Sequence, residues 1–202
     1  MRKTKTKFLL VLILICAMVS SSVYAAITVS YWYSNVNYVS KWTSTPKISQ
    51  YKLNNNDGFA FDIAFSHART QWSNAGISTT LVGWTSGCAI QCFGGTRAEI
   101  RARGYSILDS QAGVTLGSST QINTLSYNGT TKYLKSQNSP QIVCLVDRNV
   151  TQTAYKNVMT HEIGHALGWG GHSSNSSDIM YSSENSVTSL TSRDKNHLKQ
   201  VY

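Results

Sequence analysis

Two histidines and a glutamate near the C-terminal end have the spacing of a metal-binding site on a helix. His161 and His165 are four residues apart, so on a helix both imidazoles lie on one face and can reach a single metal ion. Glu162 lies beside His161, close enough to take a proton from a water molecule at that ion. Imidazole nitrogens favour zinc, and a catalytic zinc site has three protein ligands and an open position. These residue types therefore predict zinc-dependent hydrolysis.

Residues further along the chain supply the remaining parts of such a site. Gly168 follows His165 by three residues and is expected to end the helix in a left-handed conformation, which lets the chain reverse. His172 lies on the returning segment and is the candidate third ligand. The sequence Asp178-Ile179-Met180-Tyr181 offers a methionine turn, in which Met180 would form a soft hydrophobic floor below the metal. A helix that merely carries two surface histidines would explain none of these features.

The sequence resembles the metzincin metalloproteases, and within them the matrixin-like branch. The residues that carry this resemblance are His161, Glu162, His165, Gly168, His172 and Met180. It extends over roughly residues 40–202 and is most specific over 155–202. The resemblance implies an α/β fold: a twisted, mostly parallel five-stranded sheet with three helices and a zinc cleft across the middle. It also implies that an antiparallel edge strand holds an extended peptide substrate. Tyr181 to Ser183 would line the pocket that takes the substrate side chain after the cleaved bond.

The third histidine departs by one residue from the spacing of that family. The pattern His-Glu-x-x-His-x-x-Gly-x-x-His would place a histidine at 171, whereas this sequence has Gly171 followed by His172. Glycine tolerates positive φ, so we expect the extra residue to be absorbed as a bulge and His172 to remain the ligand. The alternative is a gluzincin-type site with Glu184, 19 residues after His165, as third ligand. That alternative leaves Met180 without a role.

Residues 1–25 have the composition of a secretory signal peptide. A basic start is followed by an apolar run from Phe8 to Val19 and by small residues ending at Ala25. Twelve apolar residues span only about 18 Å as a helix, too short to cross a bilayer. We therefore expect cleavage after Ala25, secretion to the extracellular space and no stable membrane anchor. Residues 26–40 then form a short N-terminal segment, and residues 41–202 form the catalytic domain.

The positive charge of the chain does not indicate a nucleic-acid-binding protein. The sequence has 18 Lys and Arg against 9 Asp and Glu, a net charge of +9, and four of the basic residues belong to the predicted signal peptide. The +5 that remains is scattered along the chain. Arg97, Arg101 and Arg103 do cluster, but Glu99 shares their face, and the alternating pattern predicts a half-buried strand. The expected partner is a protein or peptide substrate, not a nucleic acid, and the protein is expected to be a monomer.

Hydrophobic periodicity predicts a strand–helix–strands–helix–loop–helix order. The predicted helices are Phe59–Ala75, with Asp57 as N-cap, Thr151–Leu167, and Ser192–Tyr202, capped by Thr191 with Asp194 in a capping box. The predicted strands are Lys47–Leu53, Thr79–Trp84, Thr96–Tyr105, Gln121–Tyr127 and Gln141–Asp147. This order is typical of an α/β domain with one central sheet. His67 is interpreted as an ordinary histidine of the first helix.

The cysteines and acidic loops leave several questions open. Cys88, Cys92 and Cys144 are an odd number, so any disulfide leaves one thiol free within a monomer, and the sequence does not choose between the pairings. Loops near Asp109 and Asp147 would be compatible with Ca²⁺, but no specific calcium motif is present. A different class of function, a secreted zinc-containing module that binds a peptide or glycan without cutting it, has no use for the base at Glu162.

Overall fold

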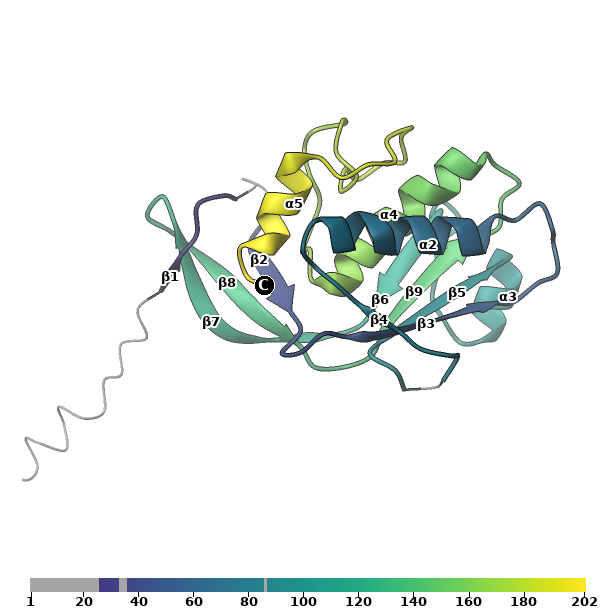
Figure 1. Ribbon diagram of the computed structural model, residues 1–202, viewed down its shortest axis with the longest axis horizontal. Coiled ribbons are helices and arrows are strands. Elements are labelled where there is room, and N and C mark those ends of the chain that lie inside the picture. The colour runs from purple at the N-terminus through teal and green to yellow at the C-terminus, as the bar shows by residue number, and fades with distance from the viewer. Residues whose placement is uncertain (1–25, 33–35, 86) are drawn as a thin grey trace, which may run out of the picture.

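The computed structural model describes residues 26–32, 36–85 and 87–202 (Figure 1). The predicted signal peptide, residues 1–25, lies outside these ranges. Within them, no helix is both long enough and apolar enough to span a membrane.

The central element is a five-stranded sheet with the order β4-β3-β5-β9-β6. Its strands are β3 (Lys47–Lys52), β4 (Thr80–Leu81), β5 (Ile90–Gly95), β6 (Gly113–Leu116) and β9 (Gln141–Val146). All neighbours are parallel except β6, which pairs antiparallel with β9 and forms one edge. The mostly parallel five-stranded sheet is therefore confirmed, although the predicted strand Thr79–Trp84 is reduced to the two residues of β4.

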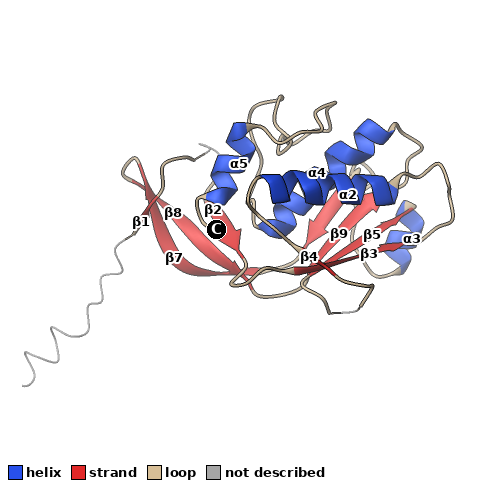
Figure 2. Ribbon diagram, in the orientation of Figure 1, coloured by secondary structure: helices blue, strands red, loops and turns tan. Residues whose placement is uncertain are grey.

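Helices cover both faces of this sheet, as a largely parallel sheet requires (Figure 2). The long helices α2 (Phe61–Asn74) and α4 (Gln152–Leu167) pack against each other and against one face. Val143 and Leu145 of β9 are buried with them, whereas Cys144 and Val146 point to the other face. Strand β9 is therefore buried on both sides, as its continuous apolar run predicts. Helix α5 (Ser192–Lys199) lies near the C-terminus and is capped by Thr191 and Asp194 as predicted.

Helix α2 buries the predicted face but begins later than expected. Phe61, Phe65, Ala68 and Trp72 are all buried, which confirms the helical spacing. Asp57 is not the N-cap, because the helix starts at Phe61 and its N-cap is Ala60, which makes no side-chain capping bond.

The segment Thr96–Tyr105 forms a helix, not the predicted strand. Helix α3 (Arg97–Ala102) begins at a capping box in which Thr96 accepts from the Glu99 backbone and Glu99 accepts from the Thr96 backbone. Its Ile100 is buried with Phe93 against the second face of the sheet. Local capping therefore outweighs the alternation of polar and apolar residues. The fold has this helix in addition to the three that were predicted.

A second, four-stranded sheet with the order β1-β7-β8-β2 extends from the first. It contains β1 (Ile27–Thr28), β2 (Tyr38–Lys41), β7 (Ser119–Tyr127) and β8 (Thr130–Gln137). Because β6 runs into β7 and β8 runs into β9, the two antiparallel pairs form one long ribbon that changes sheets. At the bend, the Ser118 backbone N–H donates to Ser139 Oγ at 3.0 Å. The N-terminal segment, including the buried Trp32, is thus part of the fold.

Candidate metal centre

Helix α4 carries the first two histidines and ends where the sequence predicts. Gly168 closes the helix with φ of 117°, and its N–H donates to the carbonyls of Gly164 at 3.1 Å and His165 at 2.9 Å. The carbonyl of Ser40 occupies the space that a β-carbon at Gly168 would need. The left-handed turn and the close approach of β2 therefore both require glycine here. The predicted helix terminator is confirmed.

The extra glycine before His172 adopts a left-handed conformation, with φ of 76° at Gly171. This is the conformation that a one-residue bulge in the loop was expected to need. The backbone after the histidine is anchored, because the Ser173 N–H donates to the Met180 carbonyl at 2.6 Å. The loop thus returns His172 to the end of α4.

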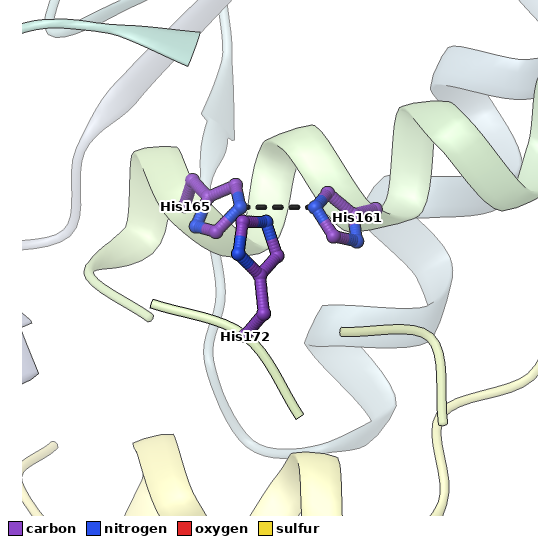
Figure 3. A group of neighbouring side chains, drawn as sticks. All are labelled: His161, His165 and His172. Carbon is purple, nitrogen blue, oxygen red and sulfur yellow. Dashed lines mark hydrogen bonds between the residues drawn. The ribbon is translucent and has the colours of Figure 1, made fainter. Parts of the chain in front are cut away.

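The three histidines converge on one point (Figure 3). One ring nitrogen from each of His161, His165 and His172 lies within 4.8 Å of the other two. The His172 ring stacks on that of His161 at a centroid distance of 5.1 Å and lies edge-on to that of His165 at 5.0 Å. They are the only group of metal-ligating side chains of this kind within the described ranges.

Hydrogen bonds to backbone carbonyls fix the tautomers of two of these histidines. His161 Nδ1 lies 2.8 Å from the Ile179 carbonyl, and His165 Nδ1 lies 2.7 Å from the Trp169 carbonyl. A carbonyl only accepts, so both Nδ1 atoms carry protons and both Nε2 atoms present lone pairs in the neutral rings. These two Nε2 atoms face each other at 3.0 Å, an arrangement that a shared cation stabilises. The donor set therefore fits a zinc ion.

Burial keeps these imidazoles in the neutral form that a metal requires. It lowers the pKa of His161 well below its ordinary value and lowers that of His165 to about 4. The same cause lowers the pKa of His172, which is only half-buried. A proton shared between the rings is thus disfavoured, which strengthens the fit to a metal ion.

Glu162 lies beside this cluster as a buried carboxyl group. Its exposed fraction is 8%, and burial raises its pKa to about 7. The Thr115 hydroxyl lies 2.8 Å from Glu162 Oε2 and 2.7 Å from the Glu162 carbonyl oxygen. Thr115 belongs to β6, the antiparallel edge strand that the resemblance implies but that the sequence pattern does not locate, so this contact was not predicted. The contact between Thr115 and Glu162 arises only from the packing of β6 on α4.

Met180 is fully buried below the end of α4, as the methionine turn predicts. A β-carbon at Gly164 would lie 2.6 Å from Met180 Sδ, so the turn packs directly on the helix. Asp194 of α5 accepts hydrogen bonds from the Ile179 N–H at 3.1 Å and the Met180 N–H at 3.2 Å. The Ile179 carbonyl in turn accepts from His161. One carboxylate on α5 therefore positions the turn that orients a ligand.

Asp178 joins the same turn to the loop of the third histidine. Its side chain is fully buried and accepts hydrogen bonds from Ser173 Oγ at 2.7 Å and Thr191 Oγ1 at 2.7 Å. It also pairs with the Arg193 guanidinium at 2.7 Å. Because Ser173 follows His172 directly, this network ties the candidate third ligand to α5. The sequence places Asp178 in the methionine turn, but its contacts to Ser173, Thr191 and Arg193 are visible only in the structure.

Glu184, the alternative third ligand, does not belong to the metal-ligating group. It pairs with Arg148 at 2.5 Å. His67, whose Nε2 lies 2.6 Å from the Thr188 carbonyl, is a helix histidine as expected.

The cysteines and the two acidic loops do not belong to the metal-ligating group of histidines. Cys88, Cys92 and Cys144 are buried free thiols, so none of the alternative disulfides is present. Asp109 pairs with Arg101 at 2.8 Å. Asp147 accepts hydrogen bonds from Asn54, Asn56 and Tyr155.

Two cavities flank the histidines, and His172 lines both. The larger has a volume of about 590 Å³ and lies beside Val158, Glu162 and the segment Tyr181–Glu184. The smaller, about 240 Å³, lies at the C-terminal end of α4 beside Gln137. The placement of Tyr181 to Ser183 agrees with the pocket that the resemblance implies. The two cavities therefore lie on either side of the candidate metal centre.

Comparison with known proteins agrees with this geometry. A search among curated proteins found no match to this chain. A model of the matrixin family, whose members are zinc-dependent endopeptidases, matches residues 38–202. The matched range contains the whole five-stranded sheet, the three histidines, Glu162 and the methionine turn. By this match, the chain belongs to the matrixin family.

Proposed function

We propose that the protein is a secreted zinc endopeptidase with one zinc ion held by His161, His165 and His172. Glu162 is its general base. The observation that carries this proposal is the convergence of three neutral imidazoles beside a buried carboxyl group. Family membership supports the same reaction class. Two of the proposed ligands are also oriented by backbone carbonyls, as metal-binding histidines usually are.

In the proposed reaction, zinc provides the Lewis acid and the protein provides the groups that move protons and position the substrate. Zinc, when bound, supplies a Lewis acid that lowers the pKa of a water molecule and polarises the scissile carbonyl. Glu162 would accept a proton from the attacking water molecule and pass it to the leaving amine. Thr115 holds the carboxyl group in position through its hydroxyl. The raised pKa of Glu162 suits both steps, because a base with a pKa near the working pH both accepts and returns a proton.

The edge strand β6 supplies a binding surface for an extended substrate. Strand β6 pairs on one side with β9, and we propose that a peptide adds antiparallel to its other side. Strand β6 runs from Gly113, at the larger cavity, to Leu116, next to the smaller one. An antiparallel peptide runs the opposite way. Its residues before the cut therefore lie at the smaller cavity, and those after the cut lie at the larger.

The place of action is proposed from the sequence alone. The composition of residues 1–25 supports export to the extracellular space, with cleavage after Ala25. A monomer is proposed because all three histidines and Glu162 come from one chain.

The test compares the wild type with Glu162→Gln on a denatured protein substrate. We expect the wild type to cleave it and to stop when a chelator is added. Glu162→Gln should bind zinc like the wild type but cleave at least about a hundredfold more slowly, because it lacks the base. A zinc-containing binding module would instead retain the substrate without cutting it. Cleavage by Glu162→Gln at the wild-type rate would refute the assignment of the base.

A further inference from the structure

An ion pair forms part of the wall of the larger cavity, at the position where the substrate side chain after the cut would enter. Arg148 and Glu184 both line this cavity, together with the polar Asn157 and Ser183. Arg148 Nη2 lies 2.5 Å from Glu184 Oε2. The side chains are 27% and 32% exposed, so both charges are partly removed from water but remain within reach of a bound ligand.

Hydrogen bonds to neighbouring side chains anchor the two chain segments that carry Arg148 and Glu184. Arg148 follows β9, and its N–H donates to the Tyr155 hydroxyl of α4 at 3.3 Å. Glu184 precedes Asn185, whose side-chain oxygen accepts a hydrogen bond from Asn157 Nδ2 at 2.8 Å. The pair therefore joins two walls of the cavity, one after β9 and one after the methionine turn.

The chemistry of the pair determines which side chain the cavity accommodates best. A large apolar side chain would displace water from both ions and give no hydrogen bond in return. A side chain with one charge would be attracted by one member of the pair and repelled by the other. A carboxamide has both a donor for Glu184 and an acceptor for Arg148, so it can satisfy both members.

We propose that the Arg148–Glu184 pair makes this cavity selective for neutral amide side chains directly after the cut. The inference rests on the proposed peptidase function and names its substrate class. Arg148 and Glu184 are specificity-determining residues, and they take no part in the chemical step. Their opposite charges cancel, which removes any preference between acidic and basic residues at this position.

The experiment measures kcat/KM on four peptides that differ only in the residue after the cut: Gln, Leu, Glu or Lys. The wild type should cleave the Gln peptide best and the Glu and Lys peptides about equally. Glu184→Gln leaves Arg148 unpaired, so the Glu-to-Lys ratio should rise about tenfold. Arg148→Gln leaves Glu184 unpaired, so the ratio should fall about tenfold. The exchanged pair, Arg148→Glu with Glu184→Arg, should return it close to the wild-type value.

Controls separate this inference from the proposed function and from folding. Arg103→Gln removes one positive charge that packs over Tyr51 and Phe93, outside the cavity lining, and should leave the ratio unchanged. If a single variant fails to fold in a thermal melt, the exchanged pair and the remaining variant still decide the outcome. A wild-type preference for Leu over Gln, or a ratio that changes less than about twofold in the variants, overturns the inference. Absence of any zinc-dependent cleavage overturns the proposed function itself.

Discussion

His172 is joined to helix α4, which carries the other two histidines, by a loop that contains Gly168 and Gly171, both with positive φ. The location of His172 therefore depends on two positions whose backbone conformation favours glycine. It also depends on the hydrogen bond from the Ser173 N–H to the Met180 carbonyl. The spacing of the motif alone could not decide between His172 and Glu184. The structure places His172 within the histidine cluster and Glu184 on Arg148.

His172→Ala and Glu184→Ala distinguish these two candidates directly. We expect His172→Ala to lower zinc affinity by at least about a hundredfold, since it removes one of three ligands. Glu184→Ala should bind zinc as the wild type does. Zinc affinity is measured by competition with a chromophoric chelator. Loss of zinc in Glu184→Ala together with its retention in His172→Ala would favour the gluzincin arrangement instead.

Helix α5 is linked to the segments around the three histidines through two buried carboxylates, its own Asp194 and Asp178 of the methionine turn. Asp194 accepts from the backbone of the methionine turn, and Asp178 accepts from the loop of His172 and pairs with Arg193. The capping box at Thr191 holds Asp194 where its carboxylate can accept these hydrogen bonds from the methionine turn. Helix α5 thus fixes the methionine turn and the loop of His172 relative to each other.

Arg193→Met should lower the free energy of unfolding by about 2–3 kcal/mol, because it leaves the fully buried Asp178 with a reduced set of donors. Chemical denaturation at pH 7 measures this loss. Arg101→Met is the matched control, since its partner Asp109 is almost fully exposed and the pair contributes little. Equal effects of the two substitutions would contradict the role given to Asp178.

The elements around the motif were predictable where pattern and local chemistry agree. Helices α2 and α4, the terminator at Gly168 and the capping box of α5 all follow from spacing and caps. Strand β5 was missed because it contains Gly94 and Gly95, which weaken the strand signal. The Phe61 ring of α2 fills the space that a side chain at Gly94 would need. That reason lies in tertiary packing and leaves no trace in the local pattern.

The second sheet was the largest feature that the sequence did not reveal. The predicted strand Gln121–Tyr127 forms most of β7. Strands β8, β1 and β2 were not predicted, and the pairing of this sheet joins residues far apart in the chain. The N-terminal segment also contacts α5, because Gln200 Nε2 donates to the Tyr31 carbonyl at 2.7 Å. His197 of α5 contacts the rings of Trp32 and Trp169, at centroid distances of 4.9 and 4.3 Å. This residue thus joins the N-terminal segment and the segment after α4 to α5.

His197 should make the stability of the whole fold depend on pH. Burial lowers its pKa from 6.5 to about 3, so the folded protein binds fewer protons than the unfolded chain between these values. Its contribution is therefore complete above pH 6.5 and is lost as the pH falls towards 3. At pH 5 the loss amounts to about 2 kcal/mol. Urea unfolding at pH 7 and pH 5 should show a smaller loss in His197→Phe than in the wild type. Equal losses would contradict this role.

We propose above all that one zinc ion at His161, His165 and His172 makes this chain a peptidase. Titration of the metal-free protein with zinc, following cleavage of a denatured protein, tests it most directly. We predict that activity is absent before the addition, rises in proportion to zinc and reaches its maximum at about one equivalent per chain. Full activity in the metal-free protein, or no cleavage at saturating zinc, would contradict the claim.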